Sequence, residues 1–176
     1  MPIKKIALAA LAVLAAAVVL AGTACKGKSA REAVAEKRLE NMLEKASGGK
    51  VDLNLRDGTM KVKTAEGESV LTTGERKWPE DLPESAVKFE DGKIQAVSRA
   101  VTEDGKTWTI HFRDVGEKAM DDYSGKLKEG GWTIEATTSM GQGGMVQASK
   151  DDLMVNIIVN TEQKAGVVSF RQGREK

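Results

Sequence analysis

Cysteine and histidine are almost absent from this sequence, which contains one of each, Cys25 and His111. A lone cysteine cannot form an internal disulfide, and a lone histidine lacks the partners of the usual zinc site. The net charge of +1 gives no general reason to expect nucleic acid as a partner. The composition therefore excludes a disulfide-stapled fold, and we expect neither a bound metal nor any other cofactor.

Proline and aromatic residues are also scarce, with three prolines and 4% aromatics. Charged residues make up 30% and hydrophobic residues 40% of the chain. These proportions are typical of a soluble globular body, and they argue against a multispanning membrane protein and against wholesale disorder. The length suits one modest domain, or one domain with an arm.

The N-terminal segment has the pattern of an export signal. Lys4 and Lys5 precede an unbroken apolar run over residues 6–21. As a helix this run would be about 24 Å long, shorter than the ~30 Å hydrocarbon core of a bilayer. We therefore predict that residues 1–24 are a signal peptide.

The small residues Gly22, Thr23 and Ala24 lead directly to Cys25. In this the sequence resembles a bacterial lipoprotein precursor, although Gly22 stands where Leu or Val is commonest. The resemblance implies that Cys25 receives a diacylglyceryl group and becomes the acylated N-terminus of the mature chain. Residues 25–28 would then be a lipidated tether, and the membrane would be a partner through the N-terminal lipid.

The resemblance also implies a location in the cell envelope. An Asp after the cysteine marks inner-membrane retention in enteric-type bacteria, and this chain has Lys26 there. The periplasmic face of the outer membrane is therefore favoured over the inner membrane. Two alternatives stay open: a plain secretory cleavage after Ala24, and an uncleaved anchor, because residues 22–25 extend the apolar stretch.

Residues 29–73 are predicted to form a helix followed by a β-hairpin. Ser29 and Glu32 have capping-box spacing, and Gly48-Gly49 ends the helix. Asp57-Gly58 is a strong hairpin-turn signal between two alternating strands. Apolar residues recur on one side of the helix, and we expect them to cover the hairpin: Ala35, Leu39, Met42, Leu43 and Ala46.

Residues 74–92 are predicted to be an irregular connector. Pro79 and Pro83 forbid a regular helix across this segment, which also contains six acidic residues. Trp78 precedes Pro79, and we consider it a candidate for an exposed contact with a partner.

Residues 93–176 are predicted to form an α+β domain with the order β-β-α-β-β-β-β. The helix has an apolar stripe from Val115 to Leu127, with a second capping box at Asp114 and Glu117. The fold class is thus α+β, an antiparallel sheet with one helix packed on one face, preceded by the N-terminal helix and β-hairpin unit. The predicted strands are 94–101, 107–113, 132–136, 145–149, 153–160 and 166–171.

This C-terminal part is similar to a module of uncharacterised bacterial envelope lipoproteins. The similarity rests on Asp122-Tyr123, Leu127 and Gly130-Gly131-Trp132, together with residues 48–51 before the Asp-Gly hairpin. These motifs are mostly caps and turns. The resemblance implies no particular activity.

Residues that carry chemistry are few. His111 lies in a predicted strand between Ile110 and Phe112, and no serine sits in a nucleophile-elbow motif. We therefore expect no enzyme but a lipid-anchored envelope protein that binds an unknown protein, peptide, glycan or lipid near the membrane. The alternative is a periplasmic enzyme that uses carboxylates or His111. The candidates for partner binding are Met140 and Met145, which flank a glycine-rich loop, and Trp78.

Overall fold

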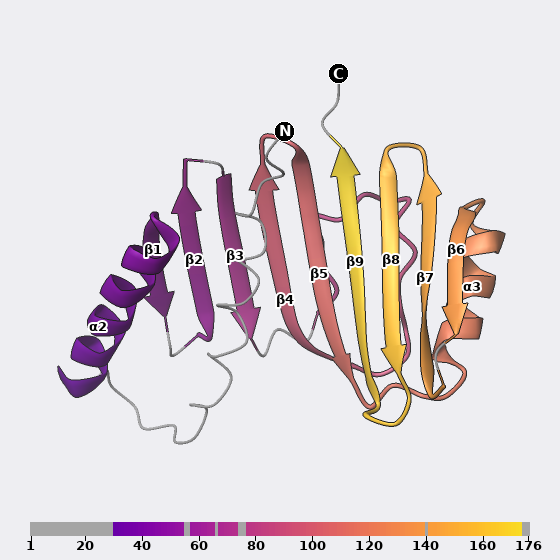
Figure 1. Cartoon of the computed structure of the whole chain (residues 1–176), viewed down its shortest axis with the longest axis horizontal. Coiled ribbons are helices and arrows are strands. Elements are labelled where there is room, and N and C mark those ends of the chain that lie inside the picture. Colours follow the sequence, from indigo (N-terminus) through magenta and orange to yellow (C-terminus); the bar gives the residue numbers. More distant parts are fainter. Residues whose placement is uncertain (1–29, 55–56, 66, 74–76, 140, 174–176) are drawn as a thin grey trace.

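The structure is a computed structural model that describes residues 30–54, 57–65, 67–73, 77–139 and 141–173. All strands belong to one antiparallel sheet with the order β1-β2-β3-β4-β5-β9-β8-β7-β6 (Figure 1). The chain order is α2 (Ala30–Ser47), β1 (Lys50–Asn54), β2 (Thr59–Thr64), β3 (Gly67–Thr73), β4 (Lys93–Thr102), β5 (Gly105–Arg113), α3 (Ala119–Glu129), β6 (Thr133–Ser139), β7 (Gly143–Lys150), β8 (Leu153–Asn160) and β9 (Ala165–Gly173).

The fold class is α+β, as the sequence predicts. From β4 onward the element order is the predicted β-β-α-β-β-β-β. The predicted hairpin unit and the C-terminal strands share one sheet, because β3 pairs with β4 from Gly67↔Thr102 to Thr73↔Ala96. The division into a unit of residues 29–73 and a domain of residues 93–176 stays a prediction.

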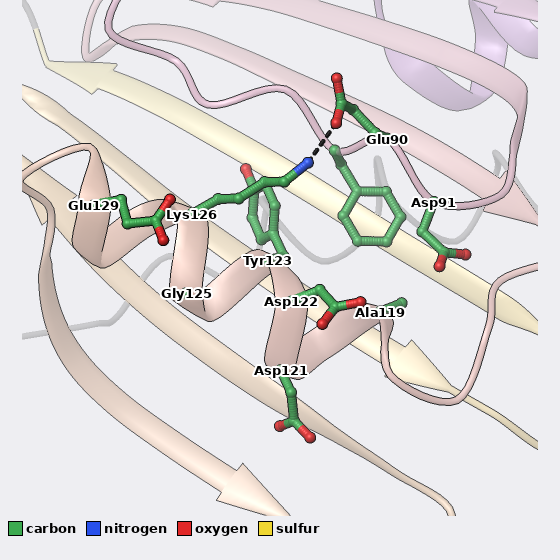
Figure 2. Close-up of a pocket in the computed structure, with 10 residues that line it drawn as sticks. Glu90, Asp91, Ala119, Asp121, Asp122, Tyr123, Gly125, Lys126 and Glu129 are labelled. Atoms are coloured by element: carbon green, nitrogen blue, oxygen red, sulfur yellow. Dashed lines mark hydrogen bonds and ion pairs between the residues drawn. The ribbon is translucent and has the colours of Figure 1, made fainter.

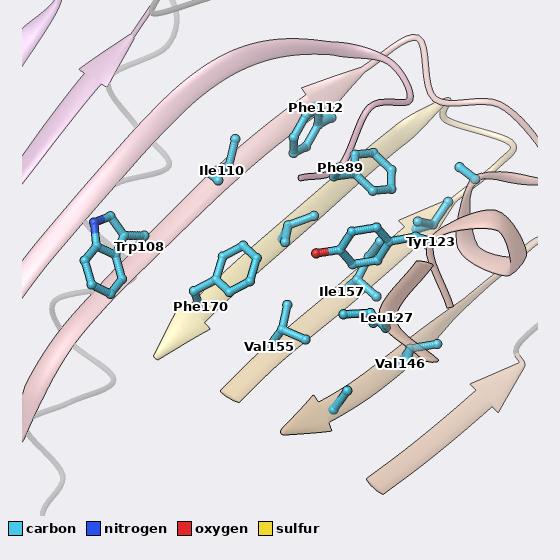
Figure 3. Close-up of a cluster of buried hydrophobic side chains, with 14 of the residues drawn as sticks. Phe89, Trp108, Ile110, Phe112, Tyr123, Leu127, Val146, Val155, Ile157 and Phe170 are labelled. Atoms are coloured by element: carbon cyan, nitrogen blue, oxygen red, sulfur yellow. The ribbon is translucent and has the colours of Figure 1, made fainter. Parts of the chain in front are cut away.

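The hydrophobic core lies on one face of the sheet, over β4, β5 and β7–β9 (Figure 3). Trp108, Ile110 and Phe112 of β5 alternate toward this face, as period-two strand geometry requires. Helix α3 packs against β6, β7 and β8 and buries Tyr123 and Leu127 there. We call this side of the sheet the core face.

The segment from Lys77 to Gly92 contains no helix or strand, yet it is part of the core. Pro79 is almost fully buried, and the Phe89 ring lies edge-on to Phe112, with 4.7 Å between ring centroids. The Tyr123 hydroxyl donates a 2.7 Å hydrogen bond to the Val87 carbonyl. This connector therefore covers the middle of the core face, while α3 covers one end.

Helix α3 begins later than the sequence indicates. The predicted capping box at Asp114 and Glu117 is wrong, because the helix starts at Ala119 with no side-chain cap. Asp114 has a positive φ of 59°, and the Gly116 amide donates to Asp91 Oδ1 at 2.8 Å. Partners elsewhere in the fold thus occupy the groups that a cap would use. The predicted Ser29 cap of α2 lies outside the described residues.

Helix α2 covers the sheet edge at β1 through its glutamates. The amide of Val51 donates to Glu44 Oε1 at 3.2 Å, and that of Leu53 donates to Glu40 Oε1 at 3.0 Å. Four helix residues rise ~6 Å, and two strand residues span ~6.6 Å. Glutamates four positions apart in α2 can therefore reach amides two positions apart in β1. Glu36 continues the series and is only 6% exposed. The glutamates therefore protect an edge that would otherwise present unpaired amides.

The two helices lie at opposite ends of the sheet (Figure 1) and on opposite faces. Val51 and Leu53 are buried, and their partners in β2 are Val62 and Met60. Followed across the register, this row points away from the core face. We call that side the second face. The expected apolar stripe of α2 is only partly used: Leu39 and Leu43 are half-buried, and Ala35, Met42 and Ala46 are exposed.

Candidate functional site

Two hollows lie on the core-face side of the described chain, and the first is an acidic depression beside α3 (Figure 2). Its volume is about 560 Å³. Phe89 and Tyr123 form part of its wall, and Lys126 is its one basic residue. Five carboxylates surround it: Glu90, Asp91, Asp121, Asp122 and Glu129.

Most of these carboxylates have a structural role in the fold. Lys126 forms an ion pair with Glu90, which holds the pKa of that carboxyl below its ordinary value (Figure 2). Asp91 accepts the amide of Gly116. Asp121 and Asp122 lie in the first turn of α3, where negative charge stabilises a helix. The depression therefore has a structural explanation and is the weaker candidate.

The second hollow is a groove of about 740 Å³ across the ends of β3, β4 and β5. Its apolar surface comes from Val70 and Val101, which stand in neighbouring rows of the core face. Val101 is 51% exposed, and α3 makes its sheet contacts with β6–β8, at the other end. The groove is thus a strip of the core face that neither α2 nor α3, the helices of the described residues, covers. We call it the β3–β5 groove.

One carboxylate organises the side of the groove next to the connector. Asp81 accepts the Nε–H of Arg99 through Oδ1 and the indole N–H of Trp108 through Oδ2, each at 2.9 Å. Burial raises the pKa of Asp81, but the Trp108 hydrogen bond and the Arg99 charge outweigh it, so the net pKa lies below 3.8. The Arg99 guanidinium is therefore held in a fixed position beside apolar surface.

The rim of the groove carries both signs of charge. Lys63 lies 4.0 Å from Glu68, and both side chains are substantially exposed. Glu103 and Lys106 extend the rim at the β4–β5 turn and are exposed. An apolar strip with a mixed polar rim suits a ligand that has an apolar part and polar groups beside it.

The two described residues that the sequence singled out for partner binding, Trp78 and Met145, do not line this groove. Trp78 is half-buried, and its ring lies edge-on to Phe170, with 5.9 Å between centroids. Met145 lies inside β7 rather than at the end of a loop, and it pairs with Ile158 of β8. Met140 and Cys25 lie outside the described residues. The roles suggested for all four stay predictions.

His111 lies on the second face in β5, half-buried, and burial lowers its pKa below 6.5. Its direct cross-strand neighbours are Ala96 and Val167, and neither has a side chain that exchanges protons. Throughout the described ranges no three His, Cys, Asp or Glu side chains gather in a way that could hold a metal ion. The surroundings of His111 therefore give no support to the enzyme alternative.

The groove residues Asp81 and Arg99 were not among the candidates that the sequence pointed to. The sequence does indicate that Arg99 is unusual. Arg99 is two residues from both Val97 and Val101 in β4, so its charge lies on the same, apolar side of the strand. Such a charge needs a partner. The partner, Asp81, comes from the connector, and the sequence alone does not show which of its six acidic residues forms the pair.

The chain matches one family model, described as START domain-like, over residues 94–166. The matched segment runs from the start of β4 into β9 and is less than half of the chain. No curated protein and no solved structure matches the chain. The comparison thus relates the strands around Trp108 and α3 to a START-like domain, whereas Lys63 and Val70 of the groove lie outside the match.

Proposed function

We propose that the protein is a lipid-anchored envelope protein that binds an amphipathic ligand in the β3–β5 groove and catalyses no reaction. The observation that carries this proposal is the strip of the core face that neither described helix covers, where Val101 is exposed beside the Arg99–Asp81 pair. The similarity to a START-like domain agrees with it, because such folds are generally ligand-binding. The helix on one face of the sheet is then part of the scaffold that leaves this strip open.

The anchoring half of the proposal is supported by the N-terminal sequence. A basic start, a short apolar run and small residues lead directly to Cys25, the one cysteine in the chain. Two or three acyl chains would hold the protein firmly, since each buried CH₂ contributes ~0.8 kcal/mol. Neither helix of the described chain has the length and apolar character to cross a membrane. We propose a location at the outer membrane, on its periplasmic face.

The binding half rests on the chemistry of the groove. Val70 and Val101 offer apolar contact at little entropic cost, because β-branched side chains in a strand are already restricted. The bond to Asp81 orients Arg99, so the positive charge of its guanidinium stands at a fixed place beside the two valines. A protein segment, a peptide, a glycan or a lipid can present this combination. The groove therefore limits the ligand to amphipathic chemistry without naming it.

Affinity purification from membranes, with the native N-terminus intact, tests the proposal. Val101→Asp places a charge in the groove, and Ile158→Asp is the matched control, because Ile158 is 47% exposed on the second face. We expect the first variant to lose the bound partner and the second to keep it, with equal thermal melts. Equal recovery from both variants would contradict the groove, and an intact mass without acyl chains on Cys25 would contradict the anchor.

A further inference from the structure

Among the described side chains of α2, residues 34–47, the charged ones on the outer side of the helix are all basic. Lys37, Arg38 and Lys45 are exposed, whereas Glu40 and Glu44 are turned to the amides of β1. Lys37 also reaches Glu40 at 3.5 Å, yet its side chain remains 75% exposed. The helix sequence contains both signs of charge, but its contact with the sheet edge separates them. The part of the surface farthest from the sheet is therefore cationic.

The same side of α2 carries two large apolar side chains. Val34 is 52% exposed and Met42 is 62% exposed, and both are among the five large hydrophobic residues that stand out from the described surface. Val34, Arg38 and Met42 follow one another at intervals of four, which places them in one row along the helix. Glu36 and Glu40 are two residues out of step with this row, hence on the opposite side of the helix. We call this row the outer ridge.

The chain between Cys25, the proposed site of the lipid anchor, and the start of α2 is short. Five residue steps separate Cys25 from Ala30, where α2 begins, so the chain between them spans at most about 17 Å. Lys26 and Lys28 lie within these steps and add positive charge. A helix tethered so closely meets the bilayer surface at high effective concentration, so even weak contacts keep it there.

We propose that α2 docks on the membrane surface by its outer ridge, with Val34 and Met42 in the headgroup region and Lys37, Arg38 and Lys45 against anionic lipid. This rests on the proposed lipid anchor at Cys25. Basic residues beside exposed apolar ones are the pattern of helices that lie in a bilayer interface. The sheet then extends away from the membrane, because α2 lies at its outermost edge beyond β1 (Figure 1). The β3–β5 groove faces the aqueous side, within reach of the bilayer.

Depth-dependent quenching of a fluorescent label tests this in the full acylated chain, reconstituted into vesicles. Met42→Cys carries the label on the ridge, and Met154→Cys is the control, a methionine 41% exposed on β8. Lipids with a spin label near the headgroup quench the fluorophore. We expect quenching at 42 to exceed that at 154 several-fold in vesicles containing phosphatidylglycerol, and to be weaker in phosphatidylcholine alone. Thermal melts of both labelled proteins check that the fold is kept.

A charge variant separates the ridge from the tether. Replacing Lys37, Arg38 and Lys45 by Gln is expected to lower the quenching at 42 toward that at 154, while the acyl anchor still holds the protein on the vesicle. Equal quenching at both positions in an acylated chain would overturn the proposal. So would a label at 42 that is shielded in native membranes but unquenched in vesicles, because a protein partner would then cover the ridge.

The intact mass of the same sample distinguishes failure of the anchor from failure of the ridge. A mass without acyl chains overturns the lipid anchor alone. The ridge is then decided by the same labelled chain mixed with vesicles that contain phosphatidylglycerol. Selective quenching at 42 supports a docking helix without an anchor, and no selective quenching overturns it.

Discussion

Replacing Asp81 by Ala is expected to destabilise the fold through a residue that is itself largely exposed. The substitution removes both bonds that join the connector to the sheet at the groove, those to Arg99 and Trp108. Trp108 is 2% exposed, so its indole N–H loses a partner in a place that water reaches only through the space left by Asp81. The effect therefore comes mainly from a buried donor and only in small part from a surface ion pair.

The magnitude follows from these two contributions. A buried donor without a partner costs ~1–3 kcal/mol, and an exposed ion pair contributes ~0–1 kcal/mol. Because the Asp81 side chain is 55% exposed, water entering the space keeps the total near the middle, at about 2 kcal/mol. For a chain of this size that lowers the melting temperature by roughly 4–8 °C.

Two further variants separate the contributions. Asp81→Asn keeps an oxygen that accepts from Trp108 and loses only the charge, so it should cost less than about 1 kcal/mol. Glu80→Ala removes the neighbouring exposed acid of the connector and is the matched control, expected to be neutral. Thermal melts by circular dichroism compare the three proteins with the wild type. Equal melting temperatures for Asp81→Ala and Glu80→Ala would show that the Asp81 hydrogen bonds do not stabilise the fold.

The pH dependence gives the same prediction a second readout. The pKa of Asp81 is below 3.8 in the folded chain, so its ionised form stabilises the fold above that pH. This contribution is lost as the pH falls through the lowered pKa of the folded state. The stability difference between the wild type and Asp81→Asn should therefore shrink in strong acid. A difference that stays constant through this range would show that Asp81 acts by shape rather than by charge.

Three other substitutions probe different parts of the fold. Tyr123→Phe removes the bond to the Val87 carbonyl and should cost ~1–2 kcal/mol in denaturant unfolding; no loss would mean that water replaces the hydroxyl. Glu40→Ala frees the edge amide of Leu53 and should cost ~1 kcal/mol, whereas Glu40→Gln, which keeps an acceptor, should cost less; the reverse order contradicts the edge-capping role. Because burial lowers the pKa of His111, the free energy of unfolding falls as the pH drops below 6.5. His111→Gln should therefore make the melting temperature depend less on pH between pH 7 and pH 5. An unchanged pH dependence would mean that other groups cause it.

The strands from β4 onward were predictable because their signals are local. Alternation placed Trp108, Ile110 and Phe112 on one side of β5, and Gly130-Gly131 marked the end of α3. Trp132, which follows these glycines, lies in the core and is 5% exposed. Such features depend on residues a few positions apart, so periodicity and turn chemistry suffice to find them.

The contacts between segments distant in the sequence were not predictable in the same way. Glu40 and Glu44 look like a solvated helix side at spacing four, and only their partners in β1 show that they cap a sheet edge. The Asp114 cap was wrong because Asp91, from the connector, already binds the Gly116 amide. The Arg99–Asp81 pair joins residues 18 positions apart. Each case depends on a tertiary neighbour that local patterns do not specify.

Site-specific photo-crosslinking in native membranes shows whether the β3–β5 groove is where the protein binds its partner. A photoreactive residue at 101 lies in the β3–β5 groove, and one at 158 lies on the second face with similar exposure. We expect a discrete adduct from position 101 and none from position 158, in a protein whose mass includes the acyl chains at Cys25. An adduct from position 158 alone, or no adduct from position 101, would contradict the assignment of the groove as the binding site.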